Sequence, residues 1–432
     1  MPEFKKIGNY RWTVCALIFF ATTINYLDRQ VIGILKPLLE SDLNIGEVEY
    51  ANIVTVFQLC YGISMFFAGR LIDKFGTKIG YMISVLLWSI AAMGHALARG
   101  VIGFGFWRAL LGVSESGNFP AANKTIAEWF PKKERALAIG IFNSGTNVGA
   151  IVAPIAVPAI IIAWGWQAAF IITGAIGFIW IILWVIFYEI PEKKRKLSVA
   201  ELDYIKSDLD EQNESEKPVP LLQLLKYRQT WLFFVGKALT DPIWWFYLFW
   251  IPGWLSTVRG AGLDIKSFGL PLVVIYTSTT VGSIGGGWLS SYLIKKGMSP
   301  FNARKYTMLI FALLVIPVFF AQSTSVTTWG AVALISLAAS AHQAWSANIF
   351  ATVSDAFPKK AVSSVTGFGG MAGAIAGAFI SIFAGHIIDF FKKAGHVGTG
   401  YTVMFTIAAC SYVLAWIIMH AFAPKVKNVV ID

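Results

Sequence analysis

Apolar runs of about twenty residues, separated by short polar segments, recur along the whole chain. A run of that length can cross a hydrocarbon core of roughly 30 Å as an α-helix. The stretch QAAFIITGAIGFIWIILWVIFY, residues 167–188, carries no charged side chain. The pattern predicts an all-α membrane protein with twelve transmembrane helices, over residues 12–35, 49–70, 79–98, 101–127, 136–163, 167–189, 231–256, 267–294, 304–322, 328–354, 361–390 and 399–423.

The distribution of basic residues predicts which side of the membrane each loop faces. If the amino terminus is inside the cell, 25 of the 35 Lys and Arg residues fall in cytoplasmic loops and tails, six fall on the opposite side and four lie within spans. Cytoplasmic loops characteristically carry this excess, so both termini are expected in the cytoplasm. The net charge of +11 is thereby explained by topology, and no nucleic-acid partner is expected.

The longest polar segment divides the chain into two parts. We expect an N-terminal six-helix half over residues 1–189, a cytoplasmic linker over 190–230 and a C-terminal six-helix half over 231–432. LSVAELDYIKSDL within the linker has helical spacing, so the linker should be partly helical. The sequence Phe-Pro-Lys-Lys occurs at residues 130–133 and again at 357–360. Parallel repeats of this kind place a substrate site at their interface near the middle of the membrane.

Four charged side chains interrupt two apolar spans and are the first candidates for function. Asp28 and Arg29 lie in TINYLDRQVIGIL, and Arg108 and Glu115 are seven residues apart on one face of the fourth span. Ionisable groups inside a span usually face a cavity or a partner. Arginine suits a substrate carboxylate because its planar fork stays charged, and the two carboxyl groups could carry protons. The alternative is a pair of structural ion pairs between the two spans.

Lys237 and Asp241 form a second charged pair, four residues apart in the seventh span. That spacing fits a structural pair on one helical face. However, Pro242 follows at once and can open the helix, as transporter sites often require. Lys237 is therefore a candidate third cation for the substrate, and Asp241 is a candidate for conformational control.

Several spans carry side chains with polar tips that suit a sugar. Hydroxyl-binding candidates are Tyr26, Tyr61, Asn147, Gln343 and Asn348, and Trp345 offers an apolar face for a sugar ring. Each of these residues could equally serve helix packing. Trp164, Trp166, Trp250 and Trp254 lie near predicted span ends and are expected to anchor the membrane interface.

The loop between the second and third spans carries a recognisable motif. GRLIDKFGTKIG, residues 69–80, resembles the G-x-L-x-D-x-x-G-x-[RK] loop of the major facilitator superfamily. The resemblance implies the superfamily fold and a gating role for Gly69, Asp73 and Gly76. In physical terms, the glycines permit a tight turn, and Asp73 could brace a neighbouring helix terminus.

Four further stretches resemble the anion:cation symporter family, and in particular its bacterial hexuronate transporters. They are NYLDRQ, FWRALLGVSESGNFPA, KALTDPIWWFYLFWIPGWL and HQAWSANIFATVSDAFPKK. The resemblance implies proton-coupled uptake of glucuronate or galacturonate through a bacterial inner membrane by alternating access. It also implies that Arg29 and Arg108 bind substrate while Asp28 and Glu115 carry the coupling protons.

Other functions remain open at this stage. The chain could carry an aldonate, an aldarate or a sugar phosphate, or it could sense sugar acids without moving them. Some sugar-acid relatives have Phe-Asn where this chain has Gly369-Gly370, which argues against a galactonate carrier. The sequence lacks Walker-type, H-E-x-x-H and G-x-S-x-G motifs, so we expect no enzyme, no cofactor and no metal site. The expected partners are a small organic anion, protons and the lipid bilayer, and the chain is expected to be a monomer.

Overall fold

The computed structural model describes residues 8–207, 221–262, 265–323, 325–357 and 359–422. Within these ranges, the side chains of residues 66, 73, 132, 133, 135–137, 221, 222, 265, 266, 354, 359, 360 and 363 lie outside the description.

All regular structure in the described part of the chain is helical. The elements are α1 (Tyr10–Leu43), α2 (Glu47–Phe75), α3 (Thr77–Gly94), η1 (His95–Leu97), α4 (Val101–Glu115), α5 (Asn118–Trp129), α6 (Lys132–Trp164), α7 (Trp166–Phe187), η2 (Pro191–Lys193), α8 (Val199–Lys206), α9 (Leu221–Leu224), α10 (Arg228–Thr257), η3 (Ile265–Gly269), α11 (Leu270–Lys295), α12 (Pro300–Val315), η4 (Ile316–Gln322), α13 (Thr328–Ala356), α14 (Lys359–Lys393) and α15 (Val397–Phe422).

Seven helices, counted over the described residues, are long and apolar enough to cross a membrane. They lie at Thr77–Leu97, Ala138–Trp164, Trp166–Phe187, Ser267–Lys295, Pro300–Gln322, Ser364–Lys393 and Val397–Phe422. The chain is therefore a multi-pass membrane protein. Helices α1, α10 and α13 are not among these seven, although they are long enough at 34, 30 and 29 residues. They carry the polar side chains singled out above, which lower their mean hydropathy.

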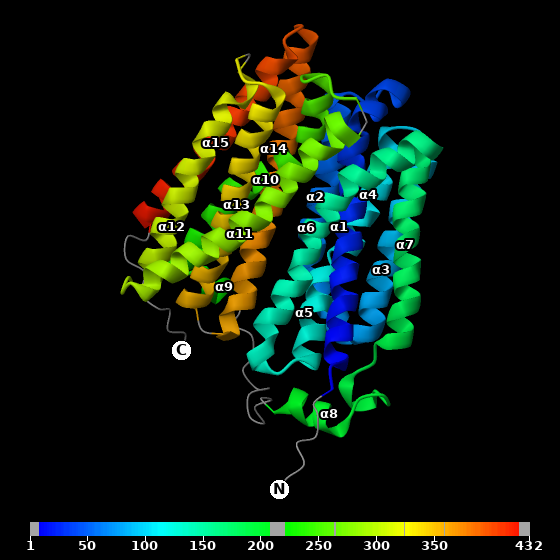
Figure 1. The fold of residues 1–432 in the computed structure, drawn as a ribbon, viewed down its shortest axis with the longest axis vertical. Coiled ribbons are helices and arrows are strands. Elements are labelled where there is room, and N and C mark those ends of the chain that lie inside the picture. Colours follow the sequence, from blue (N-terminus) through cyan, green and yellow to red (C-terminus); the bar gives the residue numbers. More distant parts are fainter. Residues whose placement is uncertain (1–7, 208–220, 263–264, 324, 358, 423–432) are drawn as a thin grey trace.

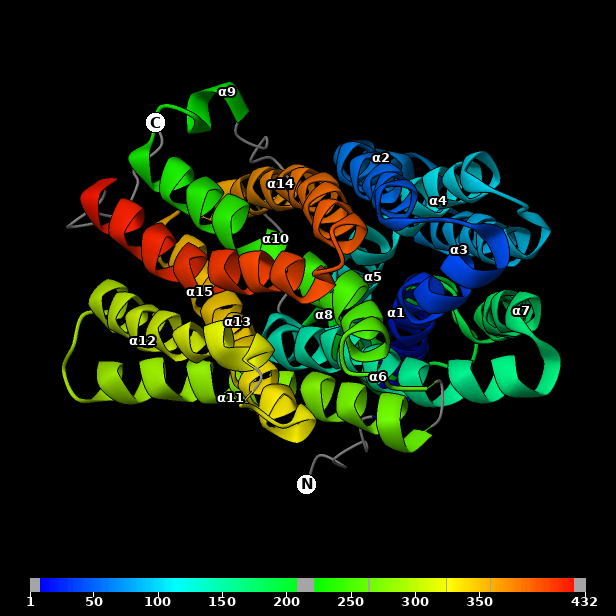
Figure 2. The ribbon, with the colours of Figure 1, turned by 90° about the horizontal axis from the view of Figure 1, so that it is seen from above.

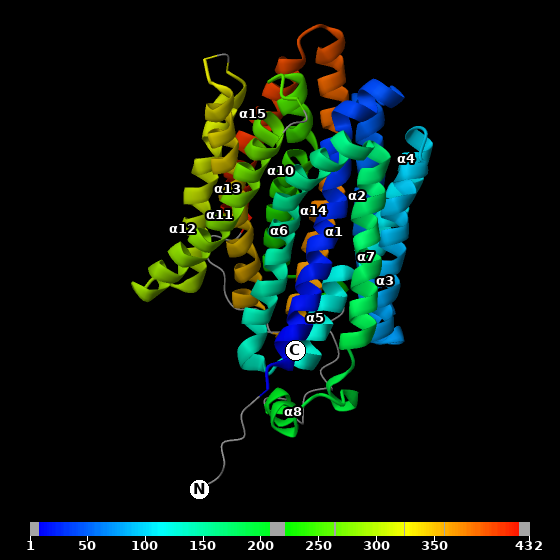
Figure 3. The same cartoon turned by 45° about the vertical axis from the view of Figure 1, so that its right-hand side comes forward.

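The long helices run roughly along the long axis of the molecule, with α1–α7 on one side and α10–α15 on the other (Figure 1). Seen from above, α2 lies beside α14 and α6 lies beside α11 along the boundary between these two groups (Figure 2). Helix α1 also contacts α10 across this boundary. The short helix α8 lies beyond the lower end of the bundle, near the start of α1 (Figure 3).

Polar contacts join the two groups of helices at the upper end of Figure 1, where α1 ends and α2 begins. The hydroxyl of Tyr50 donates to the carbonyl oxygen of Phe249 at 2.9 Å. Lys36 pairs with Glu47 at 2.7 Å, and Lys392 of α14 lies 3.8 Å from the same carboxylate and also pairs with Glu40. We call Lys36, Glu40, Glu47, Tyr50 and Lys392 the closed-end contact. Tyr50 and Lys392 make the links to α10 and from α14, while the Lys36–Glu47 pair joins α1 to α2.

Glycines allow neighbouring helices to approach closely within each group. A Cβ atom on Gly149 of α6 would lie 2.5 Å from the carbonyl oxygen of Thr23 on α1. A Cβ atom on Gly286 of α11 would lie 2.6 Å from the Cα atom of Ala344 on α13. Any larger residue would push these backbones apart, so small residues set the spacing of α1 from α6 and of α11 from α13.

The fourth predicted span is divided into α4 and α5 rather than being one continuous helix. The hydroxyl of Ser114 donates to the carbonyl of Leu110 at 2.6 Å, and that of Ser116 donates to the carbonyl of Val113 at 2.7 Å. Such side-chain bonds compete with the helix, and Gly117 next to them is a weak helix former. The division matters because Glu115 is the last residue of α4.

Helix α8 lies within the linker segment whose spacing predicted a helix. The Ser198 hydroxyl caps it by accepting from the backbone N–H of Glu201 at 3.2 Å. Glu201 also pairs with Arg11 of α1 at 3.2 Å, and Tyr204 donates to Glu134 of α6 at 2.9 Å. These contacts fasten the linker to the lower ends of α1 and α6.

The expectation that four tryptophans anchor the membrane interface is wrong for most of them. Trp164 is 69% exposed, whereas Trp250 and Trp254 are fully buried and Trp166 is nearly so. The indole N–H of Trp254 donates to Gln322 at 2.5 Å. A position near a predicted span end is compatible with a side chain that faces lipid and with one that is buried. The packing of the helices decides between these two environments.

Candidate functional site

The centre of the candidate site is an ion pair between the first and fourth predicted spans. The guanidinium of Arg29 donates to Oε2 of Glu115 through Nη2 at 2.7 Å and through Nε at 3.0 Å. The side chains are 3% and 0% exposed, respectively. Arg29 also donates to Asn25, one turn earlier on α1, at 3.3 Å. A charge-assisted pair with two donors on one oxygen is strong, so Glu115 holds Arg29 firmly in this conformation.

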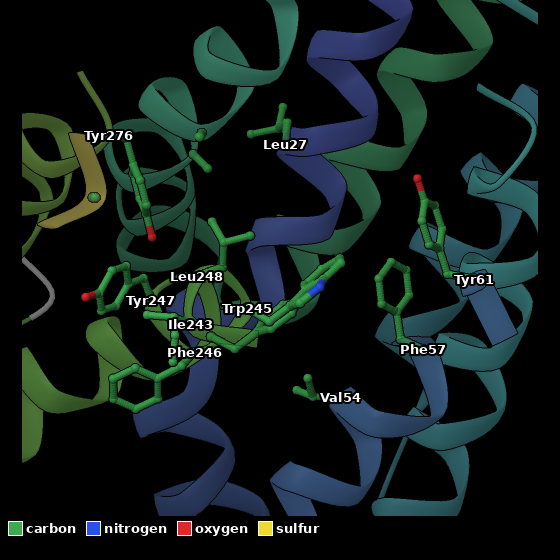
Figure 4. Close-up of a cluster of buried hydrophobic side chains, with 14 of the residues drawn as sticks. Leu27, Val54, Phe57, Tyr61, Ile243, Trp245, Phe246, Tyr247, Leu248 and Tyr276 are labelled. Carbon is green, nitrogen blue, oxygen red and sulfur yellow. The ribbon is translucent and has the colours of Figure 1, made fainter. Parts of the chain in front are cut away.

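Aromatic rings surround the guanidinium of Arg29 on its remaining sides. Its central carbon lies 4.7 Å from the ring centroid of Tyr26, 4.8 Å from Tyr61, 5.3 Å from Phe57 and 5.7 Å from Trp245. Figure 4 shows Trp245 of α10 pointing across the boundary toward Phe57 and Tyr61 of α2. These rings stabilise a cation and offer flat apolar faces, which suits a site for a sugar that carries an acid group.

Arg108 lies beside this pair with most of its hydrogen-bonding capacity unused. It is 1% exposed, and its guanidinium carbon lies 5.3 Å from the Phe57 ring centroid. One nitrogen, Nη2, donates to the carbonyl oxygen of Arg29 at 3.3 Å. Among the described residues, Nε and Nη1 have no hydrogen-bond partner. An anionic ligand could accept hydrogen bonds from these two donors and compensate the buried positive charge.

Asp28 faces away from its neighbour Arg29. It is 2% exposed, and neither carboxylate oxygen has a hydrogen-bond partner in the part of the chain that the structure describes. Its electrostatic neighbours are Glu115 and Arg108, and Thr173 of α7 lies beside it. The roughly 100° turn between adjacent helix positions explains why the two side chains serve different surroundings.

Lys237 and Asp241 form the i,i+4 pair that their spacing allowed. Lys237 Nζ lies 2.7 Å from Asp241 Oδ2, with side chains 7% and 17% exposed. The ammonium also lies 4.5 Å from the ring centroid of Phe350 on α13. On the opposite side, a Cβ atom on Gly373 of α14 would collide with the Asp241 carboxylate. This pair therefore fills the junction of α10, α13 and α14.

The remaining candidates from the sequence lie on α6 and α13. Asn147 accepts a long hydrogen bond of 3.5 Å from Thr279 of α11. The amide of Asn348 donates to the carbonyls of Gly286 and Ala344 at 3.0 and 2.9 Å, so its nitrogen serves α11–α13 packing. Trp345 is fully buried, while Gln343 is half-buried. Among the described side chains, no hydrogen bond or ion pair joins these α13 residues to Arg29.

The loop between α2 and α3 has the turn that its glycines suggested. Gly76 has φ +77°, a conformation that favours glycine. Next to it, Thr77 donates to Glu128 of α5 at 2.6 Å, and Tyr188 donates to the same carboxylate at 2.5 Å. A Cβ atom on Gly69 would meet nothing within 4 Å, so close packing does not require a glycine there. The side chain of Asp73 lies outside the described residues.

Two sets of buried contacts are not predicted from the sequence. Phe57 and Trp245 looked like ordinary core aromatics, because nothing in their spacing shows that they face a guanidinium. Lys36 and Glu47 were placed in or beside loops, yet their side chains are 4% and 1% exposed and pair with each other. The signal that could have found the second pair was the opposite charge on two segments joined by a short turn.

Comparison with known proteins identifies the family of the chain. Residues 18–381 match the family model of the Major Facilitator Superfamily. The chain is 32% identical over 391 residues to a hexuronate transporter of Escherichia coli K12, covering 89% of each chain. It is 33% identical over 314 residues to a galacturonate transporter of Dickeya chrysanthemi, covering 72% of this chain and 90% of that one.

Solved structures support the same fold. A bacterial homologue of the human lysosomal transporter Spinster, in an inward-facing and unoccupied conformation, superposes with a TM-score of 0.76 at 18% identity, covering 96% of this chain and 97% of that one. At this identity the likeness concerns the fold alone. The family match spans most of the chain, and the motif at residues 69–80 and the helical bundle agree with it. The chain belongs to the major facilitator superfamily.

Proposed function

We propose that this protein is a proton-coupled symporter that carries the hexuronates glucuronate and galacturonate into a bacterial cell through its inner membrane. Similar chains bear the names hexuronate transporter and galacturonate transporter, which favours a carrier over an enzyme. The observation that carries the proposal is the buried Arg29–Glu115 pair with Arg108 beside it, because this cluster can exchange an internal carboxylate for an external one.

The proposed topology has twelve spans with both termini in the cytoplasm. Seven helices qualify by apolarity, and the five further spans are α1, α2, α4 with α5, α10 and α13. These five carry the buried charges and most of the aromatic rings of the candidate site, and α2 and α4 still expose large apolar side chains, such as Ile63 and Ile102, that can face lipid. The 25 basic residues on one side and six on the other orient the bundle.

Alternating access would rock residues 1–189 against residues 231–432, with residues 190–230 as the connecting linker. The closed-end contact joins the two halves at the end opposite α8. Since α8 belongs to the linker that we place in the cytoplasm, the closed end would face the periplasm. Opening toward the periplasm would require the contacts that cross between the halves to break, namely those of Lys392 with Glu40 and Glu47 and that of Tyr50 with Phe249. Gly69, Asp73 and Gly76 on the cytoplasmic side, with Asp241 inside the bundle, are proposed to control the conformational change.

The substrate carboxylate would bind between Arg29 and Arg108. Arg108 has two nitrogen donors without partners among the described residues, and one carboxylate already occupies the guanidinium fork of Arg29. A guanidinium can bind a carboxylate with two parallel hydrogen bonds, which fixes the orientation of the ligand. Tyr26 and Tyr61 would flank the sugar from the N-terminal half. Asn147, Lys237, Gln343, Trp345 and Asn348 are proposed to complete the site.

Coupling would follow from competition for Arg29. When Glu115 is ionised, it occupies Arg29; when it is protonated, Arg29 becomes free for the substrate. Asp28, whose buried carboxylate has no hydrogen-bond partner in the described parts of the chain, is proposed as a second proton carrier. Moving one anion inward against an inside-negative potential of 100 mV costs about 2.3 kcal/mol. One co-transported proton cancels this cost, and a second proton would drive accumulation.

Uptake into proteoliposomes tests the proposal. Purified protein should accumulate labelled glucuronate when the vesicle interior is made alkaline, and a protonophore should abolish the accumulation. Unlabelled galacturonate should compete, while aldonates, aldarates and sugar phosphates should compete weakly.

Two outcomes would contradict the proposal. Binding of glucuronate without any uptake would indicate a sensor, and stronger competition by an aldonate or a sugar phosphate would indicate a different substrate. Protein-free vesicles and vesicles containing Arg29→Lys provide the controls, since lysine keeps the charge but loses the planar fork.

A further inference from the structure

Gln30 is a buried amide that the site described above does not use. It follows Arg29 on α1 and is 2% exposed. Among the described residues, neither its Nε2 nor its Oε1 has a hydrogen-bond partner. Burying both ends of an amide without partners is costly, so an amide in this position is a candidate for hydrogen bonds to a bound water or ligand.

The neighbours of Gln30 place it where α1, α6 and α11 meet. Gly149 of α6 packs against Tyr26 and Leu27 of α1, and Gln30 lies one turn further along the same face. A Cβ atom on Gly33, three residues beyond Gln30, would lie 3.0 Å from the carbonyl oxygen of Leu248 on α10. Gln30 therefore faces the boundary between the two groups of helices.

Tyr276 of α11 presents a second unsatisfied polar group to the same place. It is 2% exposed, and its hydroxyl has no hydrogen-bond partner in the described part of the chain. Figure 4 shows this hydroxyl directed toward Leu248 and Tyr247 of α10, the segment that α1 contacts through Gly33. The side chain of Gln30 lies next to this hydroxyl, close enough to interact with it but without the geometry of a full hydrogen bond.

Two further polar groups continue this surface. Thr279 lies one turn after Tyr276 on α11, and its hydroxyl donates to the Tyr276 carbonyl at 2.6 Å. The same hydroxyl makes the weak 3.5 Å contact with Asn147 of α6. This surface thus combines amide and hydroxyl groups from both halves, namely those of Gln30, Asn147, Tyr276 and Thr279. Gln30 is the residue next to Arg29 in the sequence.

We propose that Gln30 and Tyr276, with Asn147 and Thr279 beside them, form the subsite that recognises the ring hydroxyls of the transported sugar acid. An amide offers a donor and an acceptor, and so does a phenol hydroxyl, which matches the mixed hydrogen bonding of neighbouring sugar hydroxyls. Arg29 and Arg108 hold the carboxylate, and this subsite reads the polyhydroxy end. The inference rests on the proposed function, because it takes the ligand to be a sugar acid.

The test compares Gln30→Leu and Tyr276→Phe with a matched control, Tyr401→Phe. Tyr401 on α15 is also fully buried with no hydrogen-bond partner for its hydroxyl among the described residues, but it lies outside the candidate site. Dissociation constants for glucuronate, galacturonate and a set of deoxy analogues, each a glucuronate lacking a different ring hydroxyl, are measured by calorimetry on purified protein, together with the melting temperature without ligand.

We expect Gln30→Leu and Tyr276→Phe each to weaken glucuronate binding tenfold or more, with a smaller loss for at least one deoxy analogue. The ligand-free melting temperature should stay unchanged or rise, because an unsatisfied amide is replaced by an apolar group of similar shape. Tyr401→Phe should bind both hexuronates like the wild type.

Three results would overturn the subsite. They are wild-type affinity in both variants, an equal loss for every ligand including all deoxy analogues, and a lower melting temperature without ligand, which would indicate a structural role. If the wild type instead prefers an aldonate, an aldarate or a sugar phosphate, the hexuronate proposal fails. The same variants and criteria are then applied with that ligand and its deoxy analogues. They test whether the subsite recognises ligand hydroxyls, independently of the hexuronate proposal.

Discussion

Replacing Glu115 by glutamine removes the negative charge from the Arg29–Glu115 pair while keeping the shape of the side chain. The carboxylate receives two hydrogen bonds from Arg29, at 2.7 and 3.0 Å, and is fully buried. Removing one partner of a buried pair typically costs about 3–5 kcal/mol, because the remaining charge is left uncompensated. The Glu115→Gln protein should therefore melt at a clearly lower temperature than the wild type when no ligand is present.

Substrate should reverse much of this loss. In the mutant, no internal carboxylate competes for Arg29, so the substrate carboxylate can take the place of Glu115. We expect hexuronate to stabilise Glu115→Gln more than it stabilises the wild type. The dissociation constant of Glu115→Gln for hexuronate should vary less with pH between 5.5 and 8 than the dissociation constant of the wild type. The affinity of the wild type for hexuronate should fall as Glu115 ionises. Uphill uptake driven by a pH gradient should be lost, while exchange of labelled for unlabelled substrate should persist.

Glu189→Gln provides a matched control for this experiment. Glu189 also accepts from a cation at 2.7 Å, here Lys78, but the two side chains are about one third exposed. The hydrogen bond from Lys78 lowers the pKa of the Glu189 carboxyl, so this carboxylate is ionised throughout the assay range. Exposed pairs contribute about 0–1 kcal/mol, so stability and uptake should barely change.

Two results would refute this reasoning. Wild-type accumulation by Glu115→Gln under a pH gradient would exclude Glu115 from coupling. A loss of substrate binding in Glu115→Gln would mean that the carboxylate supports the ligand rather than competing with it.

Three further predictions concern other parts of the bundle. Arg108→Lys should weaken hexuronate binding at least tenfold, about 1.4 kcal/mol, in titration calorimetry because the open guanidinium fork is lost; normal affinity would make Arg108 part of the scaffold. Lys237→Ala should weaken binding by a similar factor, and adding Asp241→Ala should not restore it; recovery in the double variant would show a purely structural pair. Glu47→Gln should remove the charge that attracts Lys392 of α14 and leave Lys36 without its ion-pair partner, so the closed end should open, seen as a longer distance between spin labels on the α1–α2 and α10–η3 turns; an unchanged distance distribution would show that this carboxylate does not hold the halves together.

Local features of the sequence determined the fold class and several of the candidate residues. The length of an apolar run depends only on consecutive residues, so QAAFIITGAIGFIWIILWVIFY predicts the membrane helix observed as α7. A charge inside such a run is visible without knowledge of its partners, which is why Arg29, Arg108 and Glu115 could be named at once. The i,i+4 spacing of Lys237 and Asp241 likewise allowed the pair that is observed.

Tertiary structure decided which of these groups meet. Arg29 pairs with Glu115, 86 residues away, and not with the adjacent Asp28, because adjacent helix positions point in directions about 100° apart and α4 packs beside α2 close to α1. The aromatic rings around Arg29 come from three helices, and the unsatisfied groups of Gln30 and Tyr276 come from two. These contacts depend on how the helices pack across the boundary. The order of residues along the chain does not show which helix faces pack against each other.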